Sequence, residues 1–394
     1  MRRRVVAVIF VLVVLTVLVG LHVYLAEGLV YGAGLSGASR SLALAVLWTL
    51  AGSRVLAPIA ERRLGPPRAR WLAWPAAVWM GLAFLLVTLL AASDLALWLV
   101  AGAALAEGSS EASLAASSGP ARALAILGVG VLLGAVALRS GLGPPGIRRL
   151  ELTLSRWPRA LDGYRIVQIS DVHIGPILGR RFAAELVERV AALEPDLLAV
   201  TGDLVDGPVA RLEGEVAPLA GLHARDGVWF VTGNHDHYSG ADDWVGHLRS
   251  LGLRVLRNER VTLGTGDAVF DLAGVEDHHA HLMGDRPGED LEAALRDRDP
   301  ARPLVLLAHD PSTFKRASQM GVDLQLSGHT HGGQIWPFSL LVRLAVPFVA
   351  GLYQRDGSRL YVSRGTGFWG PPMRLLAPAE ITEIVLRAPG VRGA

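Results

Sequence analysis

The sequence predicts an α-helical membrane region followed by an α/β domain, because its composition changes near residue 140. Residues 1–140 carry long apolar runs and a single histidine, His22, whereas the other eleven histidines lie beyond residue 170. From Leu150 onward, short apolar stretches alternate with amphipathic ones, as expected for strands that alternate with helices. This alternation indicates sheets that are at least partly parallel, with loops gathered at the carboxyl ends of the strands.

The apolar N-terminal part explains the mean hydropathy of +0.37, which is high for a soluble protein. We expect a transmembrane region over residues 1–140, with about four spans near 5–25, 41–60, 72–92 and 123–138. The third span is expected to end at Ser93-Asp94. The apolar run Leu95–Ala106 has only twelve residues and is expected to lie in the membrane interface. A Gly/Pro-rich linker at 141–149 would lead to the domain formed by residues 150–394.

The arginines between these apolar runs predict which side of the membrane each end of the chain occupies. Three arginines precede the first span and four lie between the second and third, whereas Arg40 and Arg122 alone mark the other two connections. Because cytoplasmic loops are enriched in basic residues, both termini are expected in the cytoplasm. The chain is therefore predicted to be a multi-pass protein of the cell membrane, with residues 150–394 on the cytoplasmic side.

Composition also excludes several classes of function. The formal charge is only +2, so no basic surface field argues for a nucleic-acid partner. The chain contains no cysteine, which excludes thiolate nucleophiles, cysteine-ligated zinc and disulfide scaffolds.

Metal-binding residue types follow five of the expected strands. These stretches are Asp171-Val172-His173, Gly202-Asp203-Leu204-Val205-Asp206, Gly233-Asn234-His235-Asp236, His309-Asp310 and His329-Thr330-His331. Imidazole nitrogen and carboxylate oxygen together suit divalent Zn, Mn, Fe or Mg. Seven such ligands exceed the needs of one ion, and they suit two ions about 3.5–4 Å apart that share a bridging carboxylate. The preceding glycines are expected to let the backbone turn sharply at the site.

This set of motifs resembles the complete motif set of the calcineurin-like metallophosphoesterases. The resemblance covers about Leu150–Arg387, and all five blocks occur in the order found in that family. It implies a four-layer α/β/β/α sandwich with a dinuclear metal site along one edge of the paired sheets.

The resemblance also implies a role for each residue of the site. The first metal would be held by Asp171, His173 and His331. The second would be held by Asn234, His309 and His329, and Asp203 would bridge the two. His235 is similar to the family histidine that contacts the scissile phosphate or protonates the leaving group, and Asp236 would orient it.

Three segments keep more than one interpretation. The histidine-rich segment His278–His281 is expected to be a solvated loop, although extra metal or phosphate contacts stay open. Arg364 is either a contact to a substrate phosphate or an anchor of its loop. The segment Trp336–Tyr353 carries one charge, Arg343, and either packs in the core or forms an apolar lip that touches the bilayer or an acyl chain.

These observations predict a membrane-anchored hydrolase with two divalent metal ions (Mn, Fe, Zn or Mg). It would cleave a phosphoester or phosphoanhydride, and the membrane region favours an amphiphilic substrate such as a lipid-linked phosphate or a nucleotide-sugar lipid. Two cations would neutralise phosphate oxygens and activate a water for attack at phosphorus, so no side-chain nucleophile is needed. The alternative is a membrane signalling or scaffold protein whose domain binds a ligand without turnover. The sequence leaves the oligomeric state open.

Overall fold

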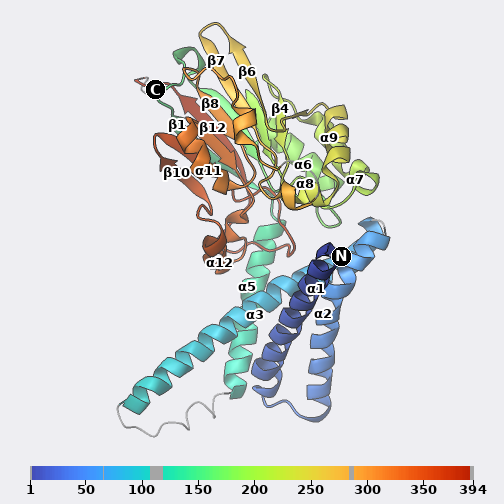
Figure 1. The fold of residues 1–394 in the computed structure, drawn as a ribbon. Helices are drawn as coiled ribbons and strands as arrows, with labels where there is room; N and C mark the ends of the chain where they lie inside the picture. Colours follow the sequence, from blue (N-terminus) through green and yellow to red (C-terminus); the bar gives the residue numbers. More distant parts are fainter. Residues whose placement is uncertain (1, 65, 107–118, 284–287, 391–394) are drawn as a thin grey trace. The chain divides into compact units, whose positions relative to one another are not determined.

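The computed structural model describes residues 2–64, 66–106, 119–283 and 288–390 (Figure 1). The chain divides into two compact units, which are described separately below. The first unit comprises residues 1–139 and 370–373, and the second comprises residues 140–369 and 374–394.

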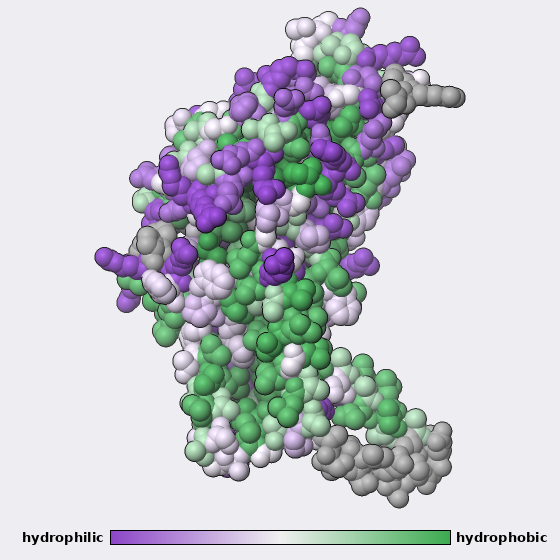
Figure 2. Space-filling view, turned by 180° about the vertical axis from the view of Figure 1, so that it is seen from behind, coloured by the Kyte–Doolittle hydropathy of each residue, from purple (hydrophilic) through white to green (hydrophobic). Residues whose placement is uncertain are grey.

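Long apolar helices form the first unit. They are α1 (Arg2–Leu25), continued by the π-helical turn η1 (Ala26–Tyr31), then α2 (Gly37–Arg63), α3 (Pro66–Ala106) and α5 (Gly119–Leu142), whose last residues enter the second unit. Four segments are long and apolar enough to cross a membrane: Val11–Tyr31, Gly37–Glu61, Arg68–Ala103 and Gly119–Leu142. The outward surface of these helices is largely apolar (Figure 2).

The third helix corrects one expectation. Helix α3 runs for 41 residues without a break, so Leu95–Ala106 continues the same helix and is not a separate element. The polar pair Ser93-Asp94 does not end the helix, because its side chains find partners on neighbouring helices. Asp94 forms an ion pair with Arg122 of α5 and accepts a hydrogen bond from the hydroxyl of Tyr24 in α1.

A buried histidine also ties the helices together. His22 of α1 contacts the carbonyl of Leu18 through Nδ1 at 2.7 Å, and its Nε2 accepts a hydrogen bond from the indole of Trp79 in α3 at 2.9 Å. Both ring nitrogens therefore have partners, as an ordinary structural histidine requires.

Two six-stranded sheets form the centre of the second unit (Figure 1). The first sheet has the order β1 (Gly146–Thr153), β12 (Glu380–Arg387), β2 (Tyr164–Ile169), β3 (Leu197–Thr201), β4 (Val228–Val231) and β5 (Arg254–Val255). The second has the order β10 (Gly351–Arg355), β11 (Ser358–Val362), β9 (Leu324–Ser327), β8 (Leu304–Leu307), β7 (Ala268–Gly274) and β6 (Glu259–Thr265). The strands that matter for the site, β2–β3–β4 and β8–β9, pair in parallel.

Strand β1 corrects the expected linker. It begins at Gly146, so most of segment 141–149 is regular structure and not a connection. Its parallel pairing with β12 supplies the backbone hydrogen bonds that a linker would have left to water, with Leu150 opposite Ile384. Three residues, 143–145, separate the end of α5 from the start of β1.

Three apolar cores show that the sandwich has four layers. Helices α6 (Arg180–Ala191), α7 (Val209–Val216) and α9 (Ala241–Ser250) pack on the outer face of the first sheet. The short helices α10 (Leu291–Ala294) and α11 (Phe314–Ala317) pack on the outer face of the second. The core between the sheets takes alternate residues of each strand, such as Leu197 and Ala199 of β3. The predicted α/β/β/α architecture is confirmed.

Shorter elements connect these layers. They are α8 (Asn234–Tyr238), α12 (Phe338–Ala345), η2 (Arg159–Leu161), η3 (Ala217–Gly221), η4 (Ala280–Met283), η5 (Pro311–Thr313), η6 (Ser318–Met320) and η7 (His331–Gly333). Two of them, α8 and η7, directly follow strand ends, and they carry residues of the predicted site.

Candidate metal centre

Every ligand predicted from the sequence lies within a few residues of the carboxyl end of a strand. Asp171 and His173 follow β2, Asp203 follows β3, Asn234 follows β4, His309 follows β8, and His329 and His331 follow β9. Because these parallel strands end at one edge of the sandwich, side chains that are far apart in sequence meet there.

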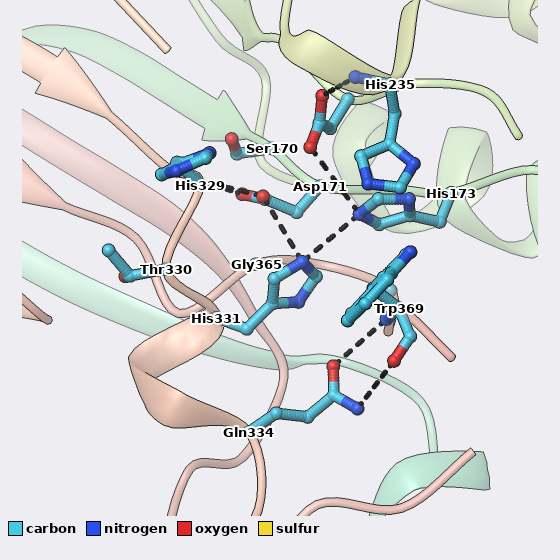
Figure 3. Close-up of polar contacts among 12 residues, drawn as sticks. Ser170, Asp171, His173, His235, His329, Thr330, His331, Gln334, Gly365 and Trp369 are labelled. Atoms are coloured by element: carbon cyan, nitrogen blue, oxygen red, sulfur yellow. Dashed lines mark hydrogen bonds and ion pairs between the residues drawn. The ribbon is translucent and has the colours of Figure 1, made fainter. Parts of the chain in front are cut away.

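The first group of ligands comprises Asp171, His173 and His331 (Figure 3). The Nε2 atoms of His173 and His331 are 3.1 Å apart, and Nε2 of His331 lies 3.4 Å from Oδ1 of Asp171. All three residues are buried. Two ring nitrogens and one carboxylate oxygen therefore point toward one small volume.

The second group comprises Asp203, His309 and His329. Nε2 of His309 lies 3.2 Å from Oδ2 of Asp203 and 3.2 Å from Nδ1 of His329. The amide oxygen of Asn234 joins this group, 3.0 Å from Nδ1 of His329. Oδ2 of Asp203 is also 3.9 Å from Nε2 of His173, so one carboxylate faces both groups.

Hydrogen bonds behind the rings fix which nitrogens face the centre. Nδ1 of His309 lies 2.8 Å from the carbonyl oxygen of Thr201, which can only accept, so this nitrogen carries the proton. Nδ1 of His173 likewise faces the carboxylate of Asp206 at 3.0 Å. In both rings Nε2 therefore faces inward, and in the neutral form of the ring it is the nitrogen whose lone pair can bind a metal. The donor set therefore fits divalent cations of the kinds predicted.

The backbone is strained at most of these ligands. Asp171, His173, Asp203, His329 and His331 all have positive φ values, between 51° and 73°. Non-glycine residues rarely adopt this left-handed conformation, and such strain concentrates at functional sites. The conformation turns each side chain abruptly away from the strand direction and into the edge of the sandwich.

The glycines of the motifs serve close packing more than turning. Gly202 does have a positive φ of 85°, as expected. Gly233 and Gly328 do not, which corrects the expectation for them. A Cβ atom on Gly233 would collide with the carboxylate of Asp203, and one on Gly328 would collide with that of Asp171. These glycines leave room for the two carboxylates.

The charges of the centre shift one another's pKa values. Burial would lower the pKa of His173, but the neighbouring carboxylates of Asp206, Asp203 and Asp171 outweigh it and raise this pKa to about 9. Burial would raise the pKa of Asp203, yet the His309, His235 and His173 rings hold it well below its usual range. Since imidazole must be neutral to ligate, metals must displace these protons, and metal affinity falls as the pH is lowered.

The partner of His235 differs from the one expected. Nδ1 of His235 lies 2.7 Å from Oδ1 of Asp206, whereas the carboxylate of Asp236 accepts hydrogen bonds from the backbone N–H groups of Asp203, Leu204 and Gly233. The role expected for Asp236 is therefore corrected. Asp206 orients His235, and Asp236 holds the loop that carries Asp203.

Two aromatic side chains border His235. Tyr238 is 65% exposed and Trp369 is 51% exposed, and both rings pack edge-on against His235 with centroids 5.3 and 5.7 Å away. The side chain of Gln334 holds the backbone of Trp369 through two hydrogen bonds, of 2.9 and 3.0 Å (Figure 3). The sequence pattern does not single out these residues, although Gln334 stands only three positions after His331.

A buried arginine was also missed. Arg374 lies almost fully inside the protein, and burial lowers its pKa to about 10. It donates hydrogen bonds to the carbonyl groups of Gly367 and Ala377, and its Nη2 lies 3.4 Å from Nδ1 of His331. A lone Pro-Pro-Met-Arg stretch carries no sequence signal for such a position.

The structure also answers two open questions. Arg364 anchors its loop, because its backbone N–H and its guanidinium both contact the carboxylate of Glu380, at 3.1 and 3.3 Å. In the histidine-rich segment, His279 is partly exposed and stacks on His329 with ring centroids 6.3 Å apart. That segment therefore borders the second ligand group and is not remote from the site.

The shared contact of Asp206 leads to a testable prediction. Because its carboxylate holds both His173 and His235, we expect Asp206→Asn to weaken Mn²⁺ binding by about 10–100-fold, measured by titration calorimetry. Asp243→Asn, on the exposed side of α9, serves as the control and should bind normally. Unchanged affinity in Asp206→Asn would contradict the positioning role.

Comparison with known proteins agrees with this geometry. Residues 164–333 match the family model for calcineurin-like phosphoesterases. A cattle protein (Bos taurus) named "Transmembrane protein with metallophosphoesterase domain" is 42% identical over 277 residues, which are 68% of this chain and 62% of the relative. A zebrafish protein (Danio rerio) of the same name is 36% identical over 288 residues, 71% of this chain and 65% of the relative. The chain thus spans just under two thirds of the length of these two relatives.

A bacterial relative is matched over nearly its whole length. This uncharacterized metallophosphoesterase of Aquifex aeolicus is 37% identical over 247 residues, which are 62% of this chain and 92% of the relative. Residues 164–333, which the family model matches, carry the strand ends and the predicted ligands described above. With its apolar N-terminal helices, the chain belongs to the calcineurin-like metallophosphoesterase family.

Proposed function

We propose that this chain is a membrane-anchored phosphoesterase that uses two divalent metal ions to hydrolyse a phosphoester or phosphoanhydride. The family depends on dinuclear metal centres. The observation that carries the proposal is the position of Asp203, whose Oδ2 faces His309 of one ligand group and His173 of the other.

The ligand groups suggest how two ions would be held. One ion would be bound by Asp171, His173 and His331, the other by Asn234, His309 and His329, and Asp203 would bridge them. Nitrogen and oxygen donors without thiolate suit Mn, Fe, Zn or Mg. When bound, the two cations would stabilise the charge of the phosphate oxygens and activate a water for attack.

His235 would assist departure of the leaving group. Asp206 contacts Nδ1 of this ring, so Nε2 is the nitrogen that can reach a substrate. A proton donated from Nε2 to the leaving oxygen would offset the charge that develops there, while the Asp206 carboxylate holds the ring in position. The backbone N–H of His235 donates to Oδ1 of Asp203 at 2.8 Å, which fixes the ring relative to the metal centre.

Complete ligand groups favour turnover over ligand binding alone. The alternative of a signalling or scaffold protein would be supported by a displaced ligand or by a His235 turned away from the centre. Instead, all seven ligand positions converge, and His235 packs against His173 with ring centroids 4.7 Å apart.

Two substitutions separate metal binding from catalysis. Because Asp203 faces both groups, Asp203→Ala should remove the metals and the activity together, whereas wild type should carry two metals per chain by elemental analysis. His235→Ala should keep both metals and lower kcat by about 10²–10⁴-fold. The exposed His223 provides a matched control, His223→Ala, with normal metal content and rate.

One metal or none in active wild-type protein would refute the dinuclear proposal. An empty site in His235→Ala would show that His235 holds the metals instead of acting on the substrate.

For the substrate, we infer an amphiphilic phosphoester such as a lipid-linked phosphate or a nucleotide-sugar lipid. Its support is the pair of exposed rings, Tyr238 and Trp369, that border His235 in a chain with four membrane-capable helices. Apolar groups that contact these rings would contribute about 0.8 kcal/mol for each buried CH₂.

The lipid preference is tested with a lipid-linked phosphate and its deacylated headgroup. We expect a higher kcat/KM for the lipid, and we expect Trp369→Ala to reduce this ratio more than a conservative Trp369→Phe does. Equal kcat/KM values for the two substrates would refute the lipid part of the proposal and leave the phosphoesterase intact.

We further propose that both termini face the cytoplasm in a cell membrane. The support is the arginine distribution together with α5, which at 24 residues is long enough to be the fourth span. Reporter fusions after Pro145 and at the C-terminus should both report the cytoplasmic side. An extracytoplasmic signal from either fusion would contradict this orientation.

A further inference from the structure

Helix α12 (Phe338–Ala345) presents an apolar surface to solvent. None of its residues is buried, and Leu340, Leu341 and Leu344 are 56%, 56% and 84% exposed. Phe338 and the nearby Trp336 are exposed as well. We call these five residues the α12 surface. Of the two interpretations of this segment, the structure shows the exposed lip and not core packing for α12.

Contacts on both sides of α12 fix the position of the α12 surface in the second unit. At its start, the backbone N–H of Trp336 donates to the carbonyl of Leu375 at 3.0 Å. Ser339 packs so closely on Gly333 that a Cβ atom there would collide with its backbone. Beyond its end, Phe348 packs between Phe314 and Tyr353 with ring centroids 5.6 and 5.0 Å away. The exposure is therefore a feature of the folded unit.

Water is a poor environment for this surface. Fully burying an exposed Leu or Phe side chain is favourable by about 1.5–3 kcal/mol. The five residues of the α12 surface are 43–84% exposed, so each would contribute part of such an amount, and together they favour a partner. The surface is nevertheless small, since a stable protein interface typically buries about 800 Å² per partner. One eight-residue helix provides little of that area. A partner already held close by another link needs far less contact.

The lipid bilayer meets that condition. Only residues 143–145 separate α5, which is long and apolar enough to span a membrane, from β1 of the sandwich. Three residues reach at most about 11 Å, so the start of β1 cannot move far from the bilayer. Segment Trp336–Tyr353 contains Arg343 and no acidic residue, and aromatic and basic side chains favour the membrane interface.

We propose that the α12 surface inserts into the headgroup region of the bilayer that holds the N-terminal helices. The contact would fix the distance of η7, and of its residue His331, from the membrane surface, because α12 packs on η7. This docking does not require that the substrate be a lipid, and it does not require turnover.

The absence of cysteine makes a direct test possible in the full chain. Leu344→Cys and Leu341→Cys would be labelled with the fluorophore NBD and placed in nanodiscs of phosphatidylcholine and phosphatidylglycerol. Asp267→Cys, in the exposed β6–β7 turn, is the aqueous control, and Val131→Cys, on the outer surface of α5, is the membrane control. Unchanged metal content confirms that each variant is folded.

We expect NBD at position 344 to report the membrane, as NBD at position 131 does, but at a shallower depth. Its emission should shift to the blue, and nitroxide lipids labelled on the upper acyl chain should quench it, whereas aqueous iodide should not. Quenching by iodide alone would show that α12 faces water and would overturn the proposal. Protection from both quenchers would also overturn it, because a protein surface, either this chain's own helices or a second copy, would then cover α12.

Discussion

The buried charge of Asp203 is the constraint on which the site depends. A carboxylate without water is tolerated only where cations or hydrogen-bond donors surround it. Here the rings of His173 and His309 and the backbone N–H of His235 supply them, from the ends of β2, β8 and β4. These strands belong to both sheets, so the two sheets must meet correctly before the charge is compensated. The sandwich and the metal centre therefore depend on each other, and bound cations would take over the role of the imidazole protons.

The fold and the ligand set could be predicted because both follow from local patterns. Strands buried on both faces give continuous apolar runs such as Leu197–Thr201 and Leu304–Leu307. Polar metal ligands placed directly after such runs must lie at one edge of the sheets, and resemblance to a known family then supplied the pairing of ligands. The helix end expected at Ser93-Asp94 is absent, because Asp94 pairs with Arg122, which lies 28 residues further along the chain and which a local pattern cannot reveal.

The sequence alone could not identify hydrogen-bond partners that depend on the direction of a side chain. Asp236 follows His235 directly, yet neighbouring residues of the short helix α8 point in different directions, and Asp236 turns toward backbone amides instead. Asp206 reaches His235 from another strand end, which a motif cannot show. Similarly, the composition of Trp336–Tyr353 fits a buried core and an exposed lip equally well. Only the fold shows that Phe348 packs against Phe314 whereas Leu344 is 84% exposed.

The segment after His331 connects the candidate metal centre to the apolar helix α12. His173 and His309 are backed by hydrogen-bond acceptors, but His331 is backed by the guanidinium of Arg374, a buried cation that also holds the carbonyl groups of its own loop. Close packing of α12 on Gly333 restricts the turn that carries His331. Exposure of an apolar helix so close to His331 is unfavourable in water, which is consistent with the proposal that the bilayer covers α12.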